Sequence, residues 1–506
     1  MPFVFVAPVG VDRLLAGVFL MLAVLGPLCT LGERNAALTG AAVVHGVAGV
    51  GSIVAGDLIT LLVCWEFLTF SAFVVIRSAQ PAGLRWQHGL SRRAPLADTP
   101  VDASFWYVGA QIVAAVLFFV AAVIHYRYTG SLVVEALHPA AQVPIVLAVL
   151  VKTAMMPLHG WLVSSYSRAT PAGSVVLSVF TTKVGVLTAV RLVSWNPSGV
   201  PILTYIGATV AVVAVVFAFL QVSARRLLAF HIVSQVGYML VGAGLAQGDA
   251  GSIGATAGLF HAANHIVYKA LLFLVVALVA NRTGHEDLRR LGGLWRRMPV
   301  VFACAIVGSG AIAGAPFLSG YASKELLKVA AGYTIPTYLL MIASVGTGLS
   351  FIKFCYLIFV RRPDASDVGS RGGVDAGRVG SSPHNPWQLG TAVVLALLSV
   401  VLGVFPGVAS GVAHRYFSGQ SLAMGVAPLF ASAFLWVALR RWLVAGVVGA
   451  GSKVASDRTR GGRLRRWLKR VSGPVLEPLH ALHRLNPQVY LGLVMVVAIA
   501  LIALLG

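Results

Sequence analysis

The sequence predicts an all-α polytopic membrane protein with about 14 transmembrane helices, an inverted-topology repeat and two broken helices. Of its 506 residues, 58% are hydrophobic and 11% are charged, and the mean hydropathy is +0.86. These values are too apolar for a soluble chain of this length. The apolar runs are continuous over roughly 20 residues, whereas strands of outer-membrane barrels alternate in polarity over about ten.

Windows of continuous apolar sequence give the spans in chain order. They lie near residues 14–31, 36–54, 58–76, 106–125, 145–164, 172–193, 201–221, 227–246, 252–280, 300–320, 335–360, 388–406, 423–441 and 486–505. Because consecutive spans alternate in direction, basic connectors should gather on the cytoplasmic side. This places on one side Arg85, Arg92, Arg93, Arg168, Arg225, Arg226, Arg289, Arg290, Arg296, Arg297, Arg361, Arg362, Arg440 and Arg441. Both termini then lie on the opposite, outer side of the membrane. A minority of the arginines, Arg13, Arg127 and Arg191, also lie on that side.

The net charge of +22 could indicate a nucleic-acid partner, but the basic residues argue against one. They cluster in short connectors beside apolar runs, as in Arg85–Arg93, Arg289–Arg297 and Arg458–Arg470, which is the positive-inside pattern. The four cysteines stand singly in apolar runs, so neither a disulfide framework nor a cluster site is predicted. The N-terminus lacks a basic stretch before its apolar residues, so no cleaved signal peptide is expected.

The fifth and tenth spans are interrupted, each by a proline with a lysine nearby. Pro157 follows Lys152, and Pro316 precedes Lys324. A proline removes one helical hydrogen bond and frees a carbonyl, which is tolerated in a membrane only where protein or water covers it. A separation of five spans turns the second copy upside-down relative to the first, which predicts an inverted repeat with its pathway near the midplane.

Ionisable residues inside the apolar spans form the candidate site. They are Glu66, Lys152, Lys183, His261, His265, Lys269, Lys324, Glu325 and Lys353. Each costs on the order of 3 kcal/mol at the bilayer centre, so nine of them need a shared explanation, and a hydrated polar axis supplies one. The other explanation is that the charges form structural ion pairs. Glu66 and Lys152 would form a switchable pair if the third and fifth spans touch, because separating the two favours neutralising both.

His261, His265 and Lys269 stand at i, i+4 and i+8, along one helical face over about 12 Å. A proton can pass along such a ladder with water between the groups. Two histidines at i, i+4 also suggest zinc, but no glutamate lies between them and no third ligand is evident, so no metal is predicted. His231, expected near the cytoplasmic mouth, Glu325 and Lys353 are secondary candidates. No nucleotide-binding, haem-attachment or cysteine-cluster motif is present, so no cofactor is predicted.

Two longer connectors are polar. Residues 365–385 are expected to form a flexible cytoplasmic loop. Residues 450–487 include Arg460–Arg470, which is either a basic amphipathic helix on anionic lipid or an ordinary positive-inside loop. The predicted division is 1–105 for N-terminal helices with Glu66, 106–195 and 196–362 for two half-channels, 363–387 for the loop and 388–506 for accessory helices.

Several motifs in this order resemble a known family. They are Gly56–Glu66, Lys152–Leu162, Leu177–Gly185, Arg226–Tyr238, His261–Phe273 and Gly292–Glu325. The chain is similar over roughly residues 37–405 to proton-conducting antiporter-like membrane subunits. That family joins the D-type subunit of Mrp-type multisubunit Na+/H+ antiporters with related subunits of respiratory complex I and membrane-bound hydrogenases.

The resemblance implies a proton pathway. Glu66 and Lys152 would be the acid and lysine of the first half-channel, Lys183 the central lysine, His265 and Lys269 the connecting groups, and Lys324 the terminal lysine. The chain departs from the family in two places: Glu66 is two helices early, and Leu162–Arg168 lacks the acid expected after the first break.

The predicted function is proton translocation in a multisubunit monovalent cation (Na+)/proton antiporter of the cell membrane. The chain itself is predicted to be a transporter subunit without catalysis. Its predicted partners are other membrane subunits, protons, Na+ or another monovalent cation, and anionic lipid. The alternatives are a pump module of a complex I-type NADH:quinone oxidoreductase or membrane-bound hydrogenase, and a membrane scaffold whose charges only hold helices together.

Overall fold

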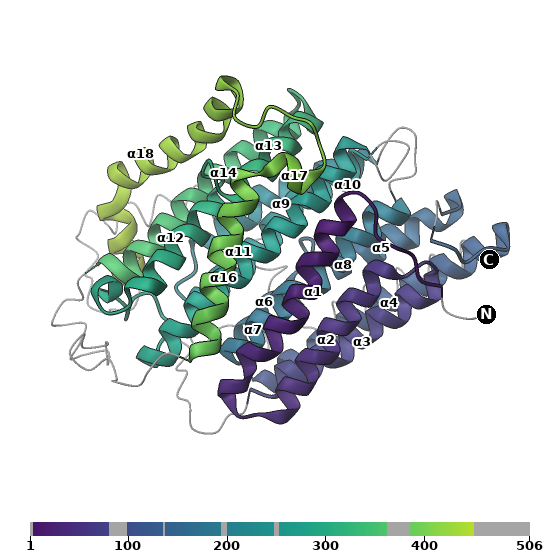
Figure 1. Ribbon diagram of the computed structural model, residues 1–506, viewed down its shortest axis with the longest axis horizontal. Helices are drawn as coiled ribbons and strands as arrows, with labels where there is room; N and C mark the ends of the chain where they lie inside the picture. The colour runs from purple at the N-terminus through teal and green to yellow at the C-terminus, as the bar shows by residue number, and fades with distance from the viewer. Residues whose placement is uncertain are drawn as a thin grey trace.

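A computed structural model describes residues 4–79, 99–134, 137–193, 200–246, 252–361 and 385–449, with the side chains of 441–449 left aside. Throughout these ranges the regular structure is helical, and extended pairing is limited to isolated bridges, which confirms the all-α prediction. The helices run side by side in one bundle (Figure 1).

The helices, in chain order, have the following bounds. They are α1 (Val11–Thr30), η1 (Leu31–Glu33), α2 (Ala36–Val54), α3 (Leu58–Arg77), α4 (Pro100–Thr129), η2 (Pro139–Ala141), α5 (Gln142–Lys152), α6 (Gly160–Arg168), α7 (Pro171–Val179), α8 (Thr181–Thr188), η3 (Ala189–Val193), α9 (Pro201–Phe219), α10 (Ala224–Gly244), α11 (Ile253–Thr283), η4 (Leu294–Arg296), α12 (Pro299–Ala313), α13 (Ser319–Ala331), α14 (Ile335–Cys355), η5 (Tyr356–Val360), α16 (Pro386–Val404), α17 (Pro406–Ser410) and α18 (Gly419–Gly449).

The described residues contain 11 helical segments long and apolar enough to cross a membrane. The two interrupted spans add pairs of shorter helices, α5 with α6 and α12 with α13. Each predicted span up to residue 441 therefore has a helix or helix pair in its place. The last predicted span, 486–505, and the connectors around Arg85–Arg93, 365–384 and 450–487 lie outside the described residues, so the count of 14 stays a prediction.

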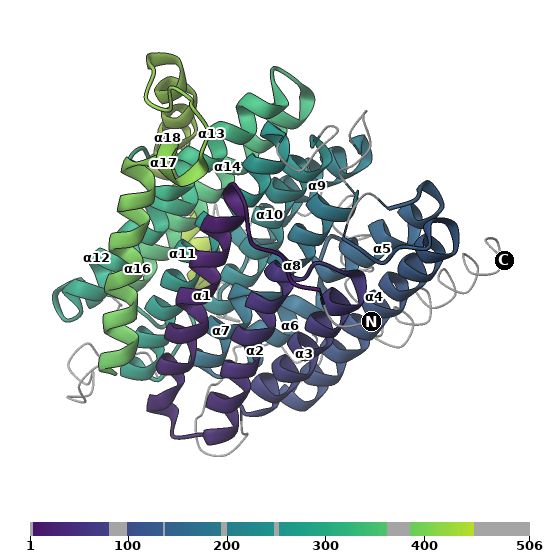
Figure 2. The same cartoon turned by 45° about the vertical axis from the view of Figure 1, so that its right-hand side comes forward.

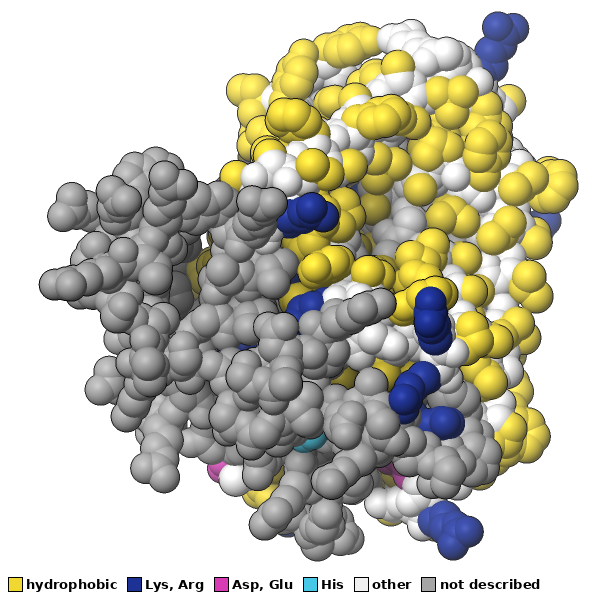
Figure 3. Space-filling view, turned by 90° about the vertical axis from the view of Figure 1, so that its left-hand side faces the viewer, with side chains coloured by type: hydrophobic (Ala, Val, Ile, Leu, Met, Phe, Trp, Pro, Cys, Tyr) yellow, Lys and Arg dark blue, Asp and Glu magenta, His cyan; other side chains and the backbone are white. Residues whose placement is uncertain are grey.

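Burial places α10 and α11 at the centre of the bundle. The most apolar stretches of α10 and α11 are entirely buried inside the protein. The corresponding stretch of α7–η3 is 94% buried, and the corresponding stretch of α18 is only 17% buried. Figure 2 shows α1 in front of this centre, with α16 and α18 toward one edge. Hydrophobic side chains cover much of the described surface on the face shown in Figure 3. Phe430 and Phe434 of α18 are among the large hydrophobic side chains that are exposed. Such a surface fits a lipid solvent.

Both predicted breaks are present. Residues 153–159 separate α5 from α6 and contain Pro157, whose bond to Met156 is cis. Residues 314–318 separate α12 from α13 and contain Pro316. Each break turns through left-handed backbone, at Ala154 (φ 56°) in the first and at Gly314 (φ 88°) and Phe317 (φ 64°) in the second.

The predicted span over 172–193 is confirmed as the helical segment Pro171–Val193. The helix is interrupted at Phe180, between α7 and α8, and ends in the π-helical turn η3. No proline or glycine marks this interruption, so the sequence carries no breaker signal there.

Among the described residues, several of the basic connectors predicted to share one side contact one another. Arg225, at the start of α10, pairs with Glu286 in the α11–α12 connector and donates to the carbonyl of Ala169 between α6 and α7. Arg361 donates to the carbonyl of Arg289 at 3.4 Å. Arg191, which is predicted to lie on the other side, pairs with Asp12 at 2.8 Å.

Asp57 fixes the start of α3, the helix that carries Glu66. Its side chain accepts from the Thr60 backbone nitrogen at 2.8 Å and from that of Val4 at 2.9 Å. Partial burial disfavours the charge, but the hydrogen bonds from Thr60 and Val4 outweigh it, so the pKa of Asp57 is lowered. The charged cap therefore persists into mild acid.

A glycine pair allows a close helix contact between α9 and α10. A Cβ atom on Gly237 would lie 2.4 Å from the Gly207 carbonyl oxygen, which leaves no room for alanine. We expect Gly237→Ala to lower the free energy of unfolding in detergent by about 1–3 kcal/mol, measured by thermal denaturation. Gly40→Ala is the matched control, because nothing lies within 4 Å of its Cβ position and the residue is helical. Equal stability of the two variants would contradict the packing argument.

Candidate functional site

The candidate site is a row of titratable side chains buried inside the bundle. Predicted site residues that are fully or almost fully buried are Lys152, Lys183, His231, His261, His265, Lys269, Lys324, Glu325 and Lys353. Glu66 differs from these residues, because its side chain is only half-buried. One face of α3 points outward, as exposed Phe67 and Phe70 show, and Glu66 lies at the border of that face.

Glu66 and Lys152 interact electrostatically across the first part of the bundle, as the sequence predicts. The Lys152 ammonium lies 4.5 Å from the centre of the Trp65 ring and 3.5 Å from the Trp65 carbonyl oxygen. One carboxylate oxygen of Glu66 is buried without a hydrogen-bond partner. Glu66 and Lys152 therefore interact, but not all of their polar atoms have hydrogen-bond partners. A change in the protonation of either residue costs less free energy here than it would in a fully hydrogen-bonded ion pair.

Lys183 lies just after the interruption at Phe180. Its ammonium donates to the Ser178 carbonyl at 2.5 Å. Ser178 belongs to the last turn of α7, whose carbonyls lose their helical partners because the helix stops at Val179. The interruption thus supplies a polar anchor for a lysine that is wholly buried.

The centre of the row consists of His265 and Lys269 on α11 and His231 on α10. His265 interacts electrostatically with Lys183, Lys269, His261 and His231. Both ring nitrogens of His265 and of His231, and the Lys269 ammonium, are buried without a hydrogen-bond partner. The prediction that His231 lies near the cytoplasmic mouth was wrong: it is fully buried and interacts with Lys269, Lys324 and Lys353.

Lys324 follows the second predicted break and is buried on α13. Its ammonium donates to the Ile312 carbonyl at 2.8 Å, at the end of α12, and lies 4.9 Å from the centre of the Tyr238 ring. Lys183 and Lys324 thus make the same kind of contact. Each lysine follows a helix break, and its ammonium donates to a carbonyl in the last helical turn before that break. Lys152 instead lies before its break, where the Val151 carbonyl accepts from the Trp161 indole at 3.1 Å and from the Ala154 backbone nitrogen at 3.0 Å.

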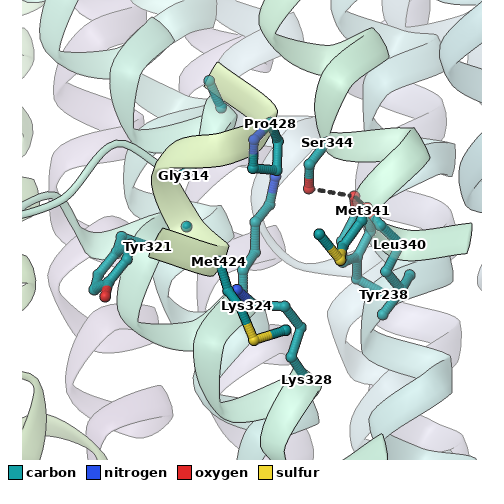
Figure 4. Close-up of a pocket in the computed structure, with 12 residues that line it drawn as sticks. Tyr238, Gly314, Tyr321, Lys324, Lys328, Leu340, Met341, Ser344, Met424 and Pro428 are labelled. Carbon is teal, nitrogen blue, oxygen red and sulfur yellow. Dashed lines mark hydrogen bonds between the residues drawn. The ribbon is translucent and has the colours of Figure 1, made fainter. Parts of the chain in front are cut away.

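A small cavity of about 20 Å³ adjoins Lys324, room for about one water molecule. Figure 4 shows it between Tyr238 of α10, Leu340, Met341 and Ser344 of α14, and Met424 and Pro428 of α18. Tyr238 is fixed there by its hydroxyl contact with Ser344 at 2.9 Å. Lys328 also lines the cavity, and its ammonium pairs with Glu325 at 2.6 Å, so Glu325 is the counter-ion of Lys328.

Lys353 branches from the row on α14. Its ammonium donates to the carbonyls of Phe219 and Gln221, at the C-terminal end of α9. The side chain is 1% exposed, so it ends inside the bundle and does not extend to the surface.

Several polar groups beside the row carry little signal in the sequence. Tyr107 of α4 contacts Thr181 of α8 through their hydroxyls at 2.9 Å, and Gln111 one turn away is wholly buried with an unpartnered amide. On α10, Gln235 accepts from the Tyr268 hydroxyl at 3.3 Å. A single uncharged polar residue in an apolar run is ordinary, so only its position in the bundle identifies it.

Comparison with known proteins identifies the family. The family model described as NADH:quinone oxidoreductase/Mrp antiporter, TM, matches residues 55–350, more than half of the chain. A Rhizobium meliloti protein, described as the A/B subunit of a probable K(+)/H(+) antiporter, is 27% identical over 381 residues, which cover 70% of this chain and 35% of that protein. NADH-quinone oxidoreductase subunit L of Pseudomonas aeruginosa is 30% identical over 306 residues, 58% of this chain and 48% of that one. The chain thus spans between a third and a half of the length of these relatives.

Among solved structures, a chain of the Mrp complex from a Dietzia species aligns with a TM-score of 0.65 at 21% identity, covering 86% of both chains. At this identity the likeness concerns the fold. The sequence match over residues 55–350 includes Glu66, Lys152, Lys183, His231, His265, Lys269 and Lys324. The chain belongs to the family of NADH:quinone oxidoreductase and Mrp antiporter transmembrane subunits.

Proposed function

We propose that this chain is the proton-translocating subunit of a multisubunit monovalent cation (Na+)/proton antiporter. The observation that supports this most is the electrostatic series of buried groups, which links Lys183 through His265 and Lys269 to His231 and Lys324. Five nitrogens at its centre, on His231, His265 and Lys269, are buried without protein partners. Buried polar groups require hydrogen bonds, and water is the partner small enough to serve all of them and to carry protons between them.

Proton movement would follow from changes in charge along the series. When Lys152 moves away from Glu66, each group loses the opposite charge that stabilises its ionised form, so the ammonium releases a proton and the carboxylate takes one up. A positive charge that leaves Lys183 reduces the repulsion felt at His265 and Lys269, which can then take up the proton. In this proposal residues 106–195 and 196–362 are the two half-channels of an inverted repeat.

The choice of an antiporter rests on the likeness of the Thr-Thr-Lys-Val and Ser-Gln-Val-Gly-Tyr motifs, at residues 181–184 and 234–238, to the D-type antiporter subunit. A relative described as part of a K(+)/H(+) antiporter and an Mrp complex among the structural neighbours support it. Other membrane subunits would be partners, the cell membrane the location, and anionic lipid a ligand of residues 450–487. The subunit would be a transporter without catalysis.

A second candidate is the pump module of a redox complex, favoured by the likeness to NADH-quinone oxidoreductase subunit L. Neighbouring genes separate the two: small antiporter subunits support the first candidate, and iron–sulfur or quinone-site subunits support the second.

The function is tested by reconstituting the complete complex in vesicles and measuring proton movement after pulses of Na+, K+ or choline. We expect Na+ to drive proton movement without NADH or quinone, and choline to drive none. Proton movement that requires a redox substrate would instead assign the chain to the second candidate. The variant Lys152→Met distinguishes a membrane scaffold from a proton pathway. If the charges only hold helices together, the variant complex should assemble poorly, but its proton flux per assembled complex should be unchanged.

A further inference from the structure

A buried histidine outside the predicted pathway, His45 on α2, adjoins its first half. The side chain is 0% exposed and interacts electrostatically with Lys152. Its ring also meets the Phe180 ring edge-on, with 5.6 Å between ring centres, so His45 lies between the Lys152 region and the interruption that precedes Lys183. Gly49, one turn further along α2, makes this approach possible, because a Cβ there would lie 2.2 Å from a Phe180 ring carbon.

The hydrogen bonds of Ser71 fix which nitrogen of His45 carries the proton. The Ser71 hydroxyl lies 2.6 Å from the Phe67 carbonyl oxygen and donates its hydrogen there. Because a hydroxyl has one hydrogen, Ser71 can only accept from His45 Nδ1, which lies 2.8 Å from it. In the neutral ring Nε2 is then an acceptor, and it is buried without a partner.

We infer that His45 is a proton-relay residue between Lys152 and the α7–α8 interruption, an inference that rests on the proposed antiporter function. The Lys152 ammonium gives a proton through water to His45 Nε2 and becomes a neutral amine, while the ring becomes imidazolium and keeps Nδ1–H on Ser71. The same proton then leaves Nε2 to water on the Phe180 side, and the ring is neutral again. Lys152 is the charged group that interacts with His45; α3 presents the uncharged Ser71 to it and the α7–α8 interruption the uncharged Phe180.

A proton-relay role accounts for the unpartnered Nε2 of His45, whereas a packing role does not. A histidine held only for packing would need no free nitrogen, and a buried unpartnered acceptor costs about 1–3 kcal/mol. The tautomer fixed by Ser71 leaves Nε2 as the acceptor, and Nε2 is the buried nitrogen without a partner. His45 interacts electrostatically with Lys152 and makes ring contact with Phe180, so it lies beside the step from Lys152 to the α7–α8 interruption.

The test uses His45→Asn in the complete complex, reconstituted in vesicles. The asparagine amide can still donate to Ser71 from the position of Nδ1 but has no group at the position of Nε2. We expect normal assembly, a half-saturating Na+ concentration within about twofold of the parent, and a maximal proton flux lowered by roughly 100-fold, the scale of a lost proton-transfer group. His125→Asn is the matched control, because His125 is also buried and its Nδ1 also takes part in a hydrogen bond, from the His138 backbone at 3.0 Å.

Flux in His45→Asn equal to the parent, or lost equally in His125→Asn, would overturn the relay. Lys183→Met in the same vesicles separates this failure from failure of the function. If Lys183→Met is inactive while His45→Asn is active, the antiporter proposal stands and His45 is a packing residue. If Lys183→Met transports normally, the pathway itself is wrong and the relay falls with it.

Discussion

Lys183→Met should lower cation-driven proton flux by at least about 100-fold while the complex assembles normally. The ammonium donates to the Ser178 carbonyl and is the positive charge that His265 and Lys269 both experience. Methionine has a similar length, but it can neither carry the proton nor change the charge felt by its neighbours. Removing a group that transfers a proton typically costs 100-fold or more. The measurement is flux per assembled complex in reconstituted vesicles.

Leu187→Met, one turn later on α8, is the control for this variant. Leu187 is wholly buried, and a leucine-to-methionine exchange conserves volume, so stability should change by less than about 1.5 kcal/mol. Its flux should stay close to that of the parent. An equal loss in Leu187→Met would show that packing on α8, and not the charge of Lys183, limits transport.

Lys324→Met should stop transport at the other end of the series. Lys324 is the positive charge that both His261 and His231 experience, and it lines the small cavity beside Tyr238 (Figure 4). Without it, a proton that reaches the centre has no group beside the α12–α13 break to accept it. We expect flux to fall by at least about 100-fold.

Lys324→Arg distinguishes a proton carrier from a fixed charge. Arginine can keep the bond to the Ile312 carbonyl and the charge beside Tyr238, but its guanidinium does not release a proton in a protein. A pathway role therefore predicts that both variants are inactive. Activity in Lys324→Arg with loss in Lys324→Met would instead assign Lys324 a structural charge, and Met341→Leu, in the wall of the same cavity, controls for packing.

The helices and two of the three interruptions were predictable from local sequence, because continuous apolar runs and prolines have physical effects that do not depend on the rest of the chain. The interruption at Phe180 was not. There the Phe180 ring packs on Phe19 of α1 and His45 of α2, which are tertiary contacts, and the Lys183 ammonium donates to the Ser178 carbonyl.

The buried lysines were predictable because an isolated charge at membrane depth is costly whatever surrounds it. The location of His231, the half-exposure of Glu66 and the part of His45 depend on which helices touch. A single histidine on an apolar helix is more often a packing residue, and only the free Nε2 of His45 and its nearness to Lys152 distinguish it.

The central claim is that protons pass along the buried row from Glu66 to Lys324. It is tested most directly by Na+-driven proton movement in vesicles that contain the complete complex, with Glu66→Gln and Lys183→Met compared with the parent at equal assembly. We predict loss of flux in both variants, because one can no longer ionise beside Lys152 and the other cannot carry a proton past the α7–α8 interruption. Flux equal to the parent in both variants would contradict the pathway.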